Sequence, residues 1–145
     1  MKSNFSIRLF NELIGKGYKV NDASNDSGDV LEVQVYLDRF DALLWVTLFV
    51  SDDDENQTLG QIFVRNIKSI SSEKRIQALE YINAINLTGS SLTFEINNQN
   101  QICVHREIFS FKNDLFSQFV NFVELFPLFF QSESVGPILN RLLSL

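Results

Sequence analysis

The segment from about Leu115 to Phe130 carries more aromatic surface than a helix needs for one contact with a core. At about 100° per residue, its large apolar side chains form two neighbouring stripes. The first stripe contains Leu115, Phe119, Phe122, Phe126 and Phe129, and the second contains Phe116, Val120, Val123 and Phe130. Together they cover about half of the helix circumference, whereas packing once against a core requires an arc of only about 100°. We therefore expect one stripe to face the chain's own core and the other to bind a partner.

The first stripe is the expected core contact, because it is unbroken before Pro127 and continues beyond that proline. The second stripe is then the expected binding surface. Trp45 is a further candidate, since tryptophan is enriched among the residues that contribute most to protein interfaces. The residues predicted to bind a partner or a second copy of the chain are Trp45, Phe116, Val120, Val123 and Phe130.

The spacing of apolar residues predicts the element order helix, three strands, helix, two strands, helix. Helices are expected over about residues 4–14, 73–86 and 113–130, with a last short helix after residues 136–137, and strands over about 31–37, 43–50, 60–68, 92–96 and 102–108. In the second helix, Ile76, Leu79, Ile82 and Ile85 are expected to form the apolar face, while the charged and polar positions face water. Short connections within each group of strands favour antiparallel pairing. We therefore expect a single domain over residues 1–145, an α+β fold with helices on a five-stranded antiparallel sheet.

The expected strand over residues 43–50 is apolar on both of its faces. This pattern is typical of a strand that is covered on both sides of its sheet. One of the two covers is expected to come from outside the protomer. We therefore expect the protein to form a homodimer at micromolar concentration.

The composition argues against several classes of partner. A net charge of −6, with only 12 lysines and arginines spread along the chain, does not suit binding to nucleic acid or to an anionic membrane. Cys103 is the single cysteine, so no internal disulfide requires an oxidising compartment. No apolar segment is long enough to span a membrane, and the first residues lack the features of a secretory signal. These observations predict a cytoplasmic protein.

Three segments carry a resemblance to a known family, namely residues 74–86 (KRIQALEYINAIN), 92–96 (LTFEI) and 102–106 (ICVHR). They resemble the YbjN family, whose members carry the label of bacterial sensory transduction regulators and are similar in fold to type III secretion chaperones. YbjN-like chains similarly place a helix that ends in two asparagines just before a hairpin. The resemblance implies a non-enzymatic α+β domain that usually dimerises. In the secretion chaperones, the homodimer holds an extended client segment on apolar grooves and sheet edges.

Two groups of residues have the ligand types of a metal site, but each is incomplete. The acidic turn at residues 52–56 has the first ligands of a calcium loop, but the turn glycine is missing and Phe63 replaces the bidentate acid. Cys103, His105 and Glu107 alternate along one strand and suit zinc, but the chain has no other cysteine or histidine to complete the site. We therefore expect no bound metal.

The leading prediction is a non-enzymatic, homodimeric protein-binding module that holds a partner polypeptide and needs no cofactor. A first alternative is a small-ligand sensor in which the phenylalanine-rich helix lines a pocket. A second alternative is a metal-dependent enzyme that uses Cys103, His105 and Glu107. Enzymatic motifs do not support this last alternative, because the chain lacks a phosphate-binding loop and a nucleophile elbow, and it has a single histidine.

Overall fold

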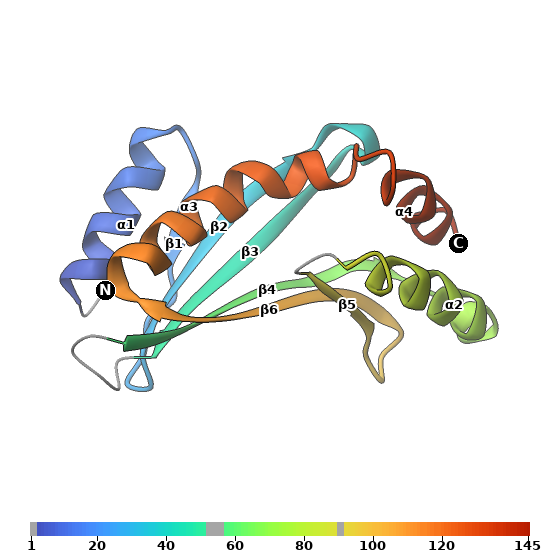
Figure 1. The fold of residues 1–145 in the computed structure, drawn as a ribbon, viewed down its shortest axis with the longest axis horizontal. Coiled ribbons are helices and arrows are strands. Elements are labelled where there is room, and N and C mark those ends of the chain that lie inside the picture. The colour runs from blue at the N-terminus through green and yellow to red at the C-terminus, as the bar shows by residue number, and fades with distance from the viewer. Residues whose placement is uncertain (1–2, 52–56, 90–91) are drawn as a thin grey trace.

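The computed structural model describes residues 3–51, 57–89 and 92–145, and the acidic turn at 52–56 lies outside this part of the chain. The helices are α1 (Asn4–Gly15), α2 (Arg75–Asn86), α3 (Lys112–Phe129) and α4 (Gly136–Leu143), with short 3-10 helices η1 (Asp38–Phe40) and η2 (Ser72–Lys74) (Figure 1). The strands are β1 (Val20–Asp22), β2 (Asp29–Leu37), β3 (Ala42–Ser51), β4 (Gln57–Ser69), β5 (Thr93–Ile96) and β6 (Gln101–Phe111). None of the described helices is long and apolar enough to cross a membrane.

The strands form one antiparallel sheet in the order β1-β2-β3-β4-β6-β5. The predicted α+β fold with an antiparallel sheet is therefore confirmed, but the predicted number of five strands is wrong. The sixth strand is β1, which pairs Val20 with Val33 and Asn21 with Glu32 at one edge of the sheet. A strand of three mostly exposed residues has no alternation of apolar and polar side chains, so periodicity cannot reveal it.

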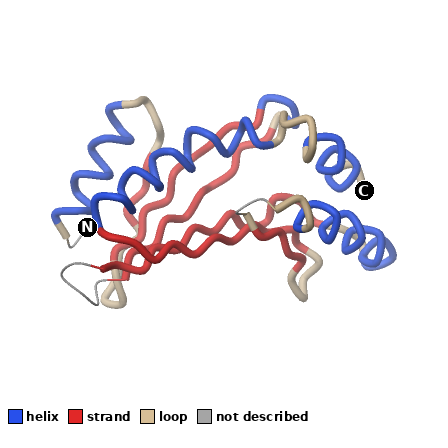
Figure 2. Tube along the Cα trace, in the orientation of Figure 1, coloured by secondary structure: helices blue, strands red, loops and turns tan. Residues whose placement is uncertain are grey.

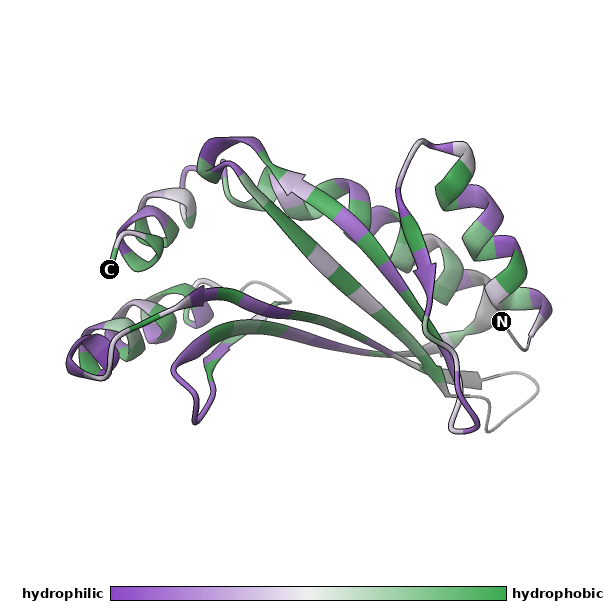
Figure 3. Cartoon of the chain, turned by 180° about the vertical axis from the view of Figure 1, so that it is seen from behind, coloured by the Kyte–Doolittle hydropathy of each residue, from purple (hydrophilic) through white to green (hydrophobic). Residues whose placement is uncertain are grey.

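The helices cover one face of the sheet. Along β2, alternate side chains from Asp29 to Leu37 are buried and the side chains between them are not. Seen from behind in Figure 3, the strands β2 and β3 lie in front of helix α3. We call the uncovered side the open face, and its apolar side chains on the central strands are Tyr36, Leu43, Trp45, Phe49 and Phe63.

The sheet divides into two arms. The β3–β4 ladder runs from Ser51 and Leu59 to Val46 and Val64, where it ends. Beyond this point β4 contains a bulge, in which Asn66 has a φ of 51°, and the two strands diverge (Figures 1 and 2). Helix α3 runs along the arm of β2 and β3, while α2 packs on β5 and contacts α4 across the open end.

The expectation that the second stripe of α3 is exposed is wrong for three of its four residues. Val120, Val123 and Phe130 are buried within the protomer, and only Phe116 is half-buried. The reason is that α3 has more than one neighbour. Helix α1 brings the ring of Phe5 to 6.0 Å from that of Phe116, and η1 brings Phe40 to 5.8 Å from Phe130.

Helix α2 also presents a different face to the core than expected. Its buried residues are Ala78, Ile82 and Ile85, whereas Ile76 is 75% exposed and Leu79 is also exposed. On a helix, a step of three residues falls about 60° short of a full turn. Three such steps place Ile76 on about the opposite side from Ile85, so an apolar repeat of three cannot mark one buried stripe.

Close contact between α3 and β4 depends on Gly60. A Cβ atom at this position would overlap a methyl group of Leu115 and approach Phe119 Cζ to 2.9 Å. We expect Gly60→Ala to lower the free energy of unfolding by about 1–3 kcal/mol, the usual cost of overfilling a packed core. In Gly15→Ala, the matched control, the new methyl group meets no atom within 4 Å. This control should be neutral or stabilising by up to about 1 kcal/mol. Urea unfolding compares the two, and equal stability would show that α3 does not rest directly on β4.

Candidate functional site

A pocket of about 290 Å³ lies between helix α3 and strand β6, and we call it the α3–β6 pocket. Its lining residues come from α3, from β6 and from the segment just before β5. They are Leu92, Arg106, Gln118, Asn121, Phe122, Leu125, Phe126 and Phe129. The pocket is therefore built from the phenylalanine-rich helix and from the hairpin strands that follow α2.

Helix α3 contributes six of these residues from a single face, because their positions recur at intervals of three and four. Aromatic contacts hold the rings in place. Phe122 and Phe126 are stacked with ring centroids 5.3 Å apart, and Phe129 stacks on Phe94 of β5 at 6.0 Å. The rings are thus fixed before any ligand enters, as is usual for the apolar wall of a small-molecule site.

Arg106 occupies an unusual position for a charged residue. It lies on the helix-covered face of β6, where its neighbours two residues away, Val104 and Ile108, are both buried. Its partner across the ladder is Ile62, which is also buried. Arg106 Nη2 donates a long hydrogen bond of 3.5 Å to Gln118 Oε1. Among the described residues, no carboxylate lies within ion-pair distance of this guanidinium.

The polar groups of the pocket can bind a ligand but do not suit catalysis. They are the guanidinium of Arg106 and the amides of Gln118 and Asn121. The guanidinium is a hydrogen-bond donor, and the amides both donate and accept, but none of the three is a nucleophile. Together with the phenylalanine rings they form an apolar site that has polar donors on one side.

The open face of the sheet is separate from this pocket. Leu43 is 60% exposed there, and Trp45, one of the predicted binding residues, is 37% exposed. Lys19 Nζ lies 5.9 Å from the centre of the Trp45 ring. The structure therefore does not bring Trp45 together with the predicted residues of α3, which lie on the other side of the sheet. Of those residues, the half-buried Phe116 contacts the Arg8 guanidinium at 4.3 Å.

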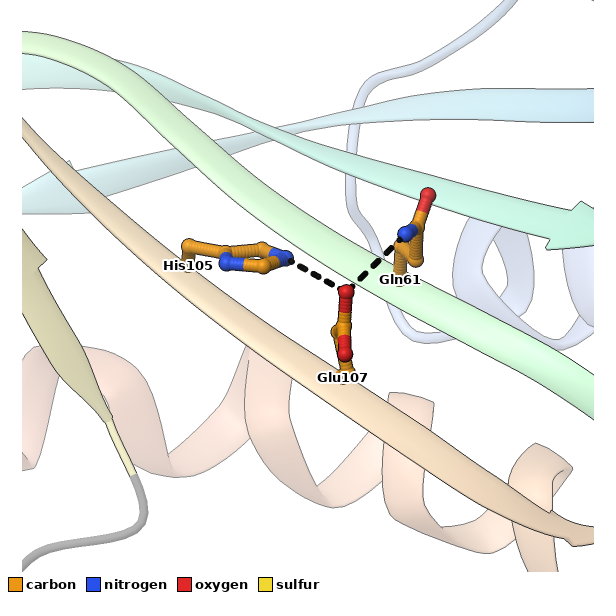
Figure 4. Close-up of polar contacts among 3 residues, drawn as sticks. All are labelled: Gln61, His105 and Glu107. Atoms are coloured by element: carbon orange, nitrogen blue, oxygen red, sulfur yellow. Dashed lines mark hydrogen bonds and ion pairs between the residues drawn. The ribbon is translucent and has the colours of Figure 1, made fainter.

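Cys103, His105 and Glu107 share the open face of β6, as predicted from their alternation. Their side chains do not converge on one point. His105 stacks on Phe63 with ring centroids 4.8 Å apart, and its Nε2 atom lies 3.7 Å from Glu107 Oε1 (Figure 4). Cys103 Sγ donates instead to the carbonyl of Gln101 at 3.6 Å. Within the described residues, no group of three histidine, cysteine or acidic side chains can hold a metal ion.

The sequence analysis did not single out Arg106, although the sequence contains the signal for it. Along β6, residues 102, 104 and 108 are apolar and alternate toward the covered face, and Arg106 interrupts that row. A charged residue in the buried row of a strand usually marks an edge, a paired charge or a ligand site.

The comparisons with known proteins are negative. No protein-family model matches this sequence, and no curated protein is significantly similar to it. The resemblance to the YbjN family and to secretion chaperones therefore stays a prediction, and the site must be judged by its own geometry.

The Cys103, His105 and Glu107 group yields a direct prediction. We expect the purified protein to contain zinc only at background level, and Cys103→Ala and His105→Ala to leave that level unchanged, because the three side chains have different neighbours. Elemental analysis by mass spectrometry measures this. A stoichiometric amount of zinc that either substitution removes would contradict the prediction.

Proposed function

We propose that this chain is a non-enzymatic binding protein that takes a small, mainly apolar ligand into the α3–β6 pocket. The observation that carries the proposal is the row of Phe122, Phe126 and Phe129 along one wall of a pocket of about 290 Å³. Small-molecule sites are typically concave, largely apolar, and supplied with a few polar groups that orient the ligand. This was the first alternative from the sequence. It gains support because most of the apolar stripe that was assigned to a protein partner is used inside the protomer.

The expected affinity is modest. Each methylene group moved from water to an apolar site contributes about 0.8 kcal/mol, so a chain of eight carbons gains roughly 6 kcal/mol. Part of this gain is lost to the entropy of immobilising the ligand. Binding in the micromolar to millimolar range is the consequence, which suits a sensor that must release its ligand when the concentration falls.

The position of the pocket relates binding to the shape of the sheet. One wall belongs to α3, which contacts β2 of the first arm as well as β4 and β6, and the other belongs to β6 in the second arm. A ligand that contacts Phe126 and Arg106 together bridges the two arms and favours one angle between them. A ligand can produce a regulatory response only if it binds one arrangement of the two arms more tightly than another.

A neutral fluorescent probe tests the proposed site. We expect the emission of 1-naphthylamine, whose size matches the pocket, to shift to shorter wavelength on binding the wild-type protein and 1-octanol to displace it. Asn121→Trp should reduce probe binding by about tenfold or more, because Asn121 is an exposed residue at the pocket and a large ring there fills it. Ser117→Trp, an equally large change at an exposed α3 position outside the pocket, should leave binding unchanged. Equal loss in both variants, or no binding by the wild type, would refute the site.

A second candidate function is binding of another protein or a second copy of the chain on the open face. The exposure of Leu43 and Trp45 on the doubly apolar strand β3 favours it, together with the exposed Tyr36. Exposed apolar side chains that gather on one surface commonly mark an interaction site. This candidate retains the homodimer expected from the sequence and places its interface on the sheet.

Light scattering across a range of concentrations tests this interface. We expect a dimer at micromolar concentration, and Leu43→Ser should weaken dimerisation by about tenfold, as for a central apolar contact. Leu128→Ser is the control, because Leu128 is similarly exposed but lies on α3. Emission from Trp45, the only tryptophan, should shift to shorter wavelength as the dimer forms. A particle of 16.7 kDa at every concentration would remove this candidate.

A further inference from the structure

Arg106 indicates the charge of the ligand, which the apolar wall of the pocket does not. A half-buried guanidinium next to Val104 and Ile108 has lost part of its hydration, and this loss is costly unless a partner compensates it. Among the described residues, its side-chain partner is the neutral amide of Gln118, through one long hydrogen bond. An anionic group in the pocket would supply the missing partner.

The charge of the pocket indicates the charge of the ligand. Arg106 is the only charged residue among the described residues that line it, and the other polar lining groups are the neutral amides of Gln118 and Asn121. A single cation balances a single negative charge. A carboxylate fits this requirement and accepts two parallel hydrogen bonds from the guanidinium fork. A phosphate monoester, which carries nearly two charges at neutral pH, would leave one of them unbalanced.

The pocket also separates its polar and apolar groups. Of the lining residues on α3, Gln118 comes first along the helix, Asn121 lies near its middle, and Phe129 lies at its end. At about 1.5 Å per residue, Gln118 and Phe129 are roughly 16 Å apart along the helix axis. A ligand with a charged head and an apolar tail matches this arrangement. At about 30 Å³ for each water-sized group, the volume of about 290 Å³ holds about ten non-hydrogen atoms.

We propose that the α3–β6 pocket selects small carboxylates of about eight carbons in all, and that Arg106 binds the carboxylate while Phe122, Phe126 and Phe129 contact the apolar tail. This inference rests on the proposed small-ligand function and adds the chemical class of the ligand to it. Octanoate, with ten non-hydrogen atoms, is the matching probe. 1-Octanol has the same number of carbons without the charge.

Isothermal titration calorimetry with sodium octanoate and with 1-octanol tests the proposal on the whole chain of 145 residues. Wild-type protein should bind octanoate about tenfold more tightly than 1-octanol. Arg106→Gln should weaken octanoate binding by about 10- to 100-fold, the range expected for a lost charge-assisted pair, and should change 1-octanol binding by less than about twofold. Arg65→Gln is the matched control, because Arg65 is exposed and packs on Phe63 of the open face. It should leave both affinities unchanged.

The outcomes separate this inference from the proposed function. Binding of 1-octanol without any preference for octanoate, or an octanoate affinity that Arg106→Gln does not change, overturns the carboxylate inference alone. Failure of both ligands and of the neutral naphthylamine probe overturns the proposed function itself. If circular dichroism shows Arg106→Gln to be unfolded, the preference of the wild-type protein for octanoate over 1-octanol decides the question. This preference should become smaller in high salt, because salt screens the attraction between two charges. A leucine-ended peptide with a free carboxylate that binds more tightly than octanoate would overturn the small-molecule assignment.

Discussion

The structure depends on the way helix α3 buries about half of its circumference. The sheet packs against one side of the helix at Gly60, where the absence of a side chain lets Leu115 and Phe119 approach the backbone of β4. Helix α1 packs against a second side of α3, where Phe5 contacts Phe116 and Phe119 edge to face. These neighbours come from distant parts of the chain. The apolar excess of α3 therefore joins the N-terminal helix and the sheet into one core.

The same helix determines where the pocket forms. The β3–β4 ladder ends at Val46 and Val64, and the bulge in β4 then turns the two arms of the sheet apart. Helix α3 contacts β2, β4 and β6, and side chains of α3 and β6 line the space between the helix and the second arm. Large rings fill most of this space, and a volume of about 290 Å³ remains beside Arg106. The pocket thus follows from the divergence of two strands rather than from a dedicated loop.

Sequence reasoning recovered the features that depend on local periodicity and missed those that depend on distant neighbours. The alternation of β2 and the two-sided apolar pattern of β3 were readable, and the exposure of Leu43 agrees with an uncovered second face. The burial of Phe130 could not be read from the sequence, because it depends in part on Phe40 of η1. The exposed Ile76 was assigned wrongly because a repeat of three differs from the helical period of 3.6. Arg106 was readable as an interruption of an apolar row, but its missing carboxylate partner required the packed structure.

Arg106 is best understood as a residue kept for binding rather than for stability. An isolated charge in a mostly apolar environment usually costs stability, and proteins commonly gain stability when apolar residues of similar size replace buried charges. At this position an aliphatic side chain would continue the row formed by Val104 and Ile108 and would pack against the rings of α3. Residues that break such a local rule, here a charged residue in an apolar row, are found mainly at functional sites, where another requirement outweighs stability. Because the guanidinium lies beside the phenylalanine wall, the requirement that we propose is recognition of a ligand with an anionic head and an apolar tail.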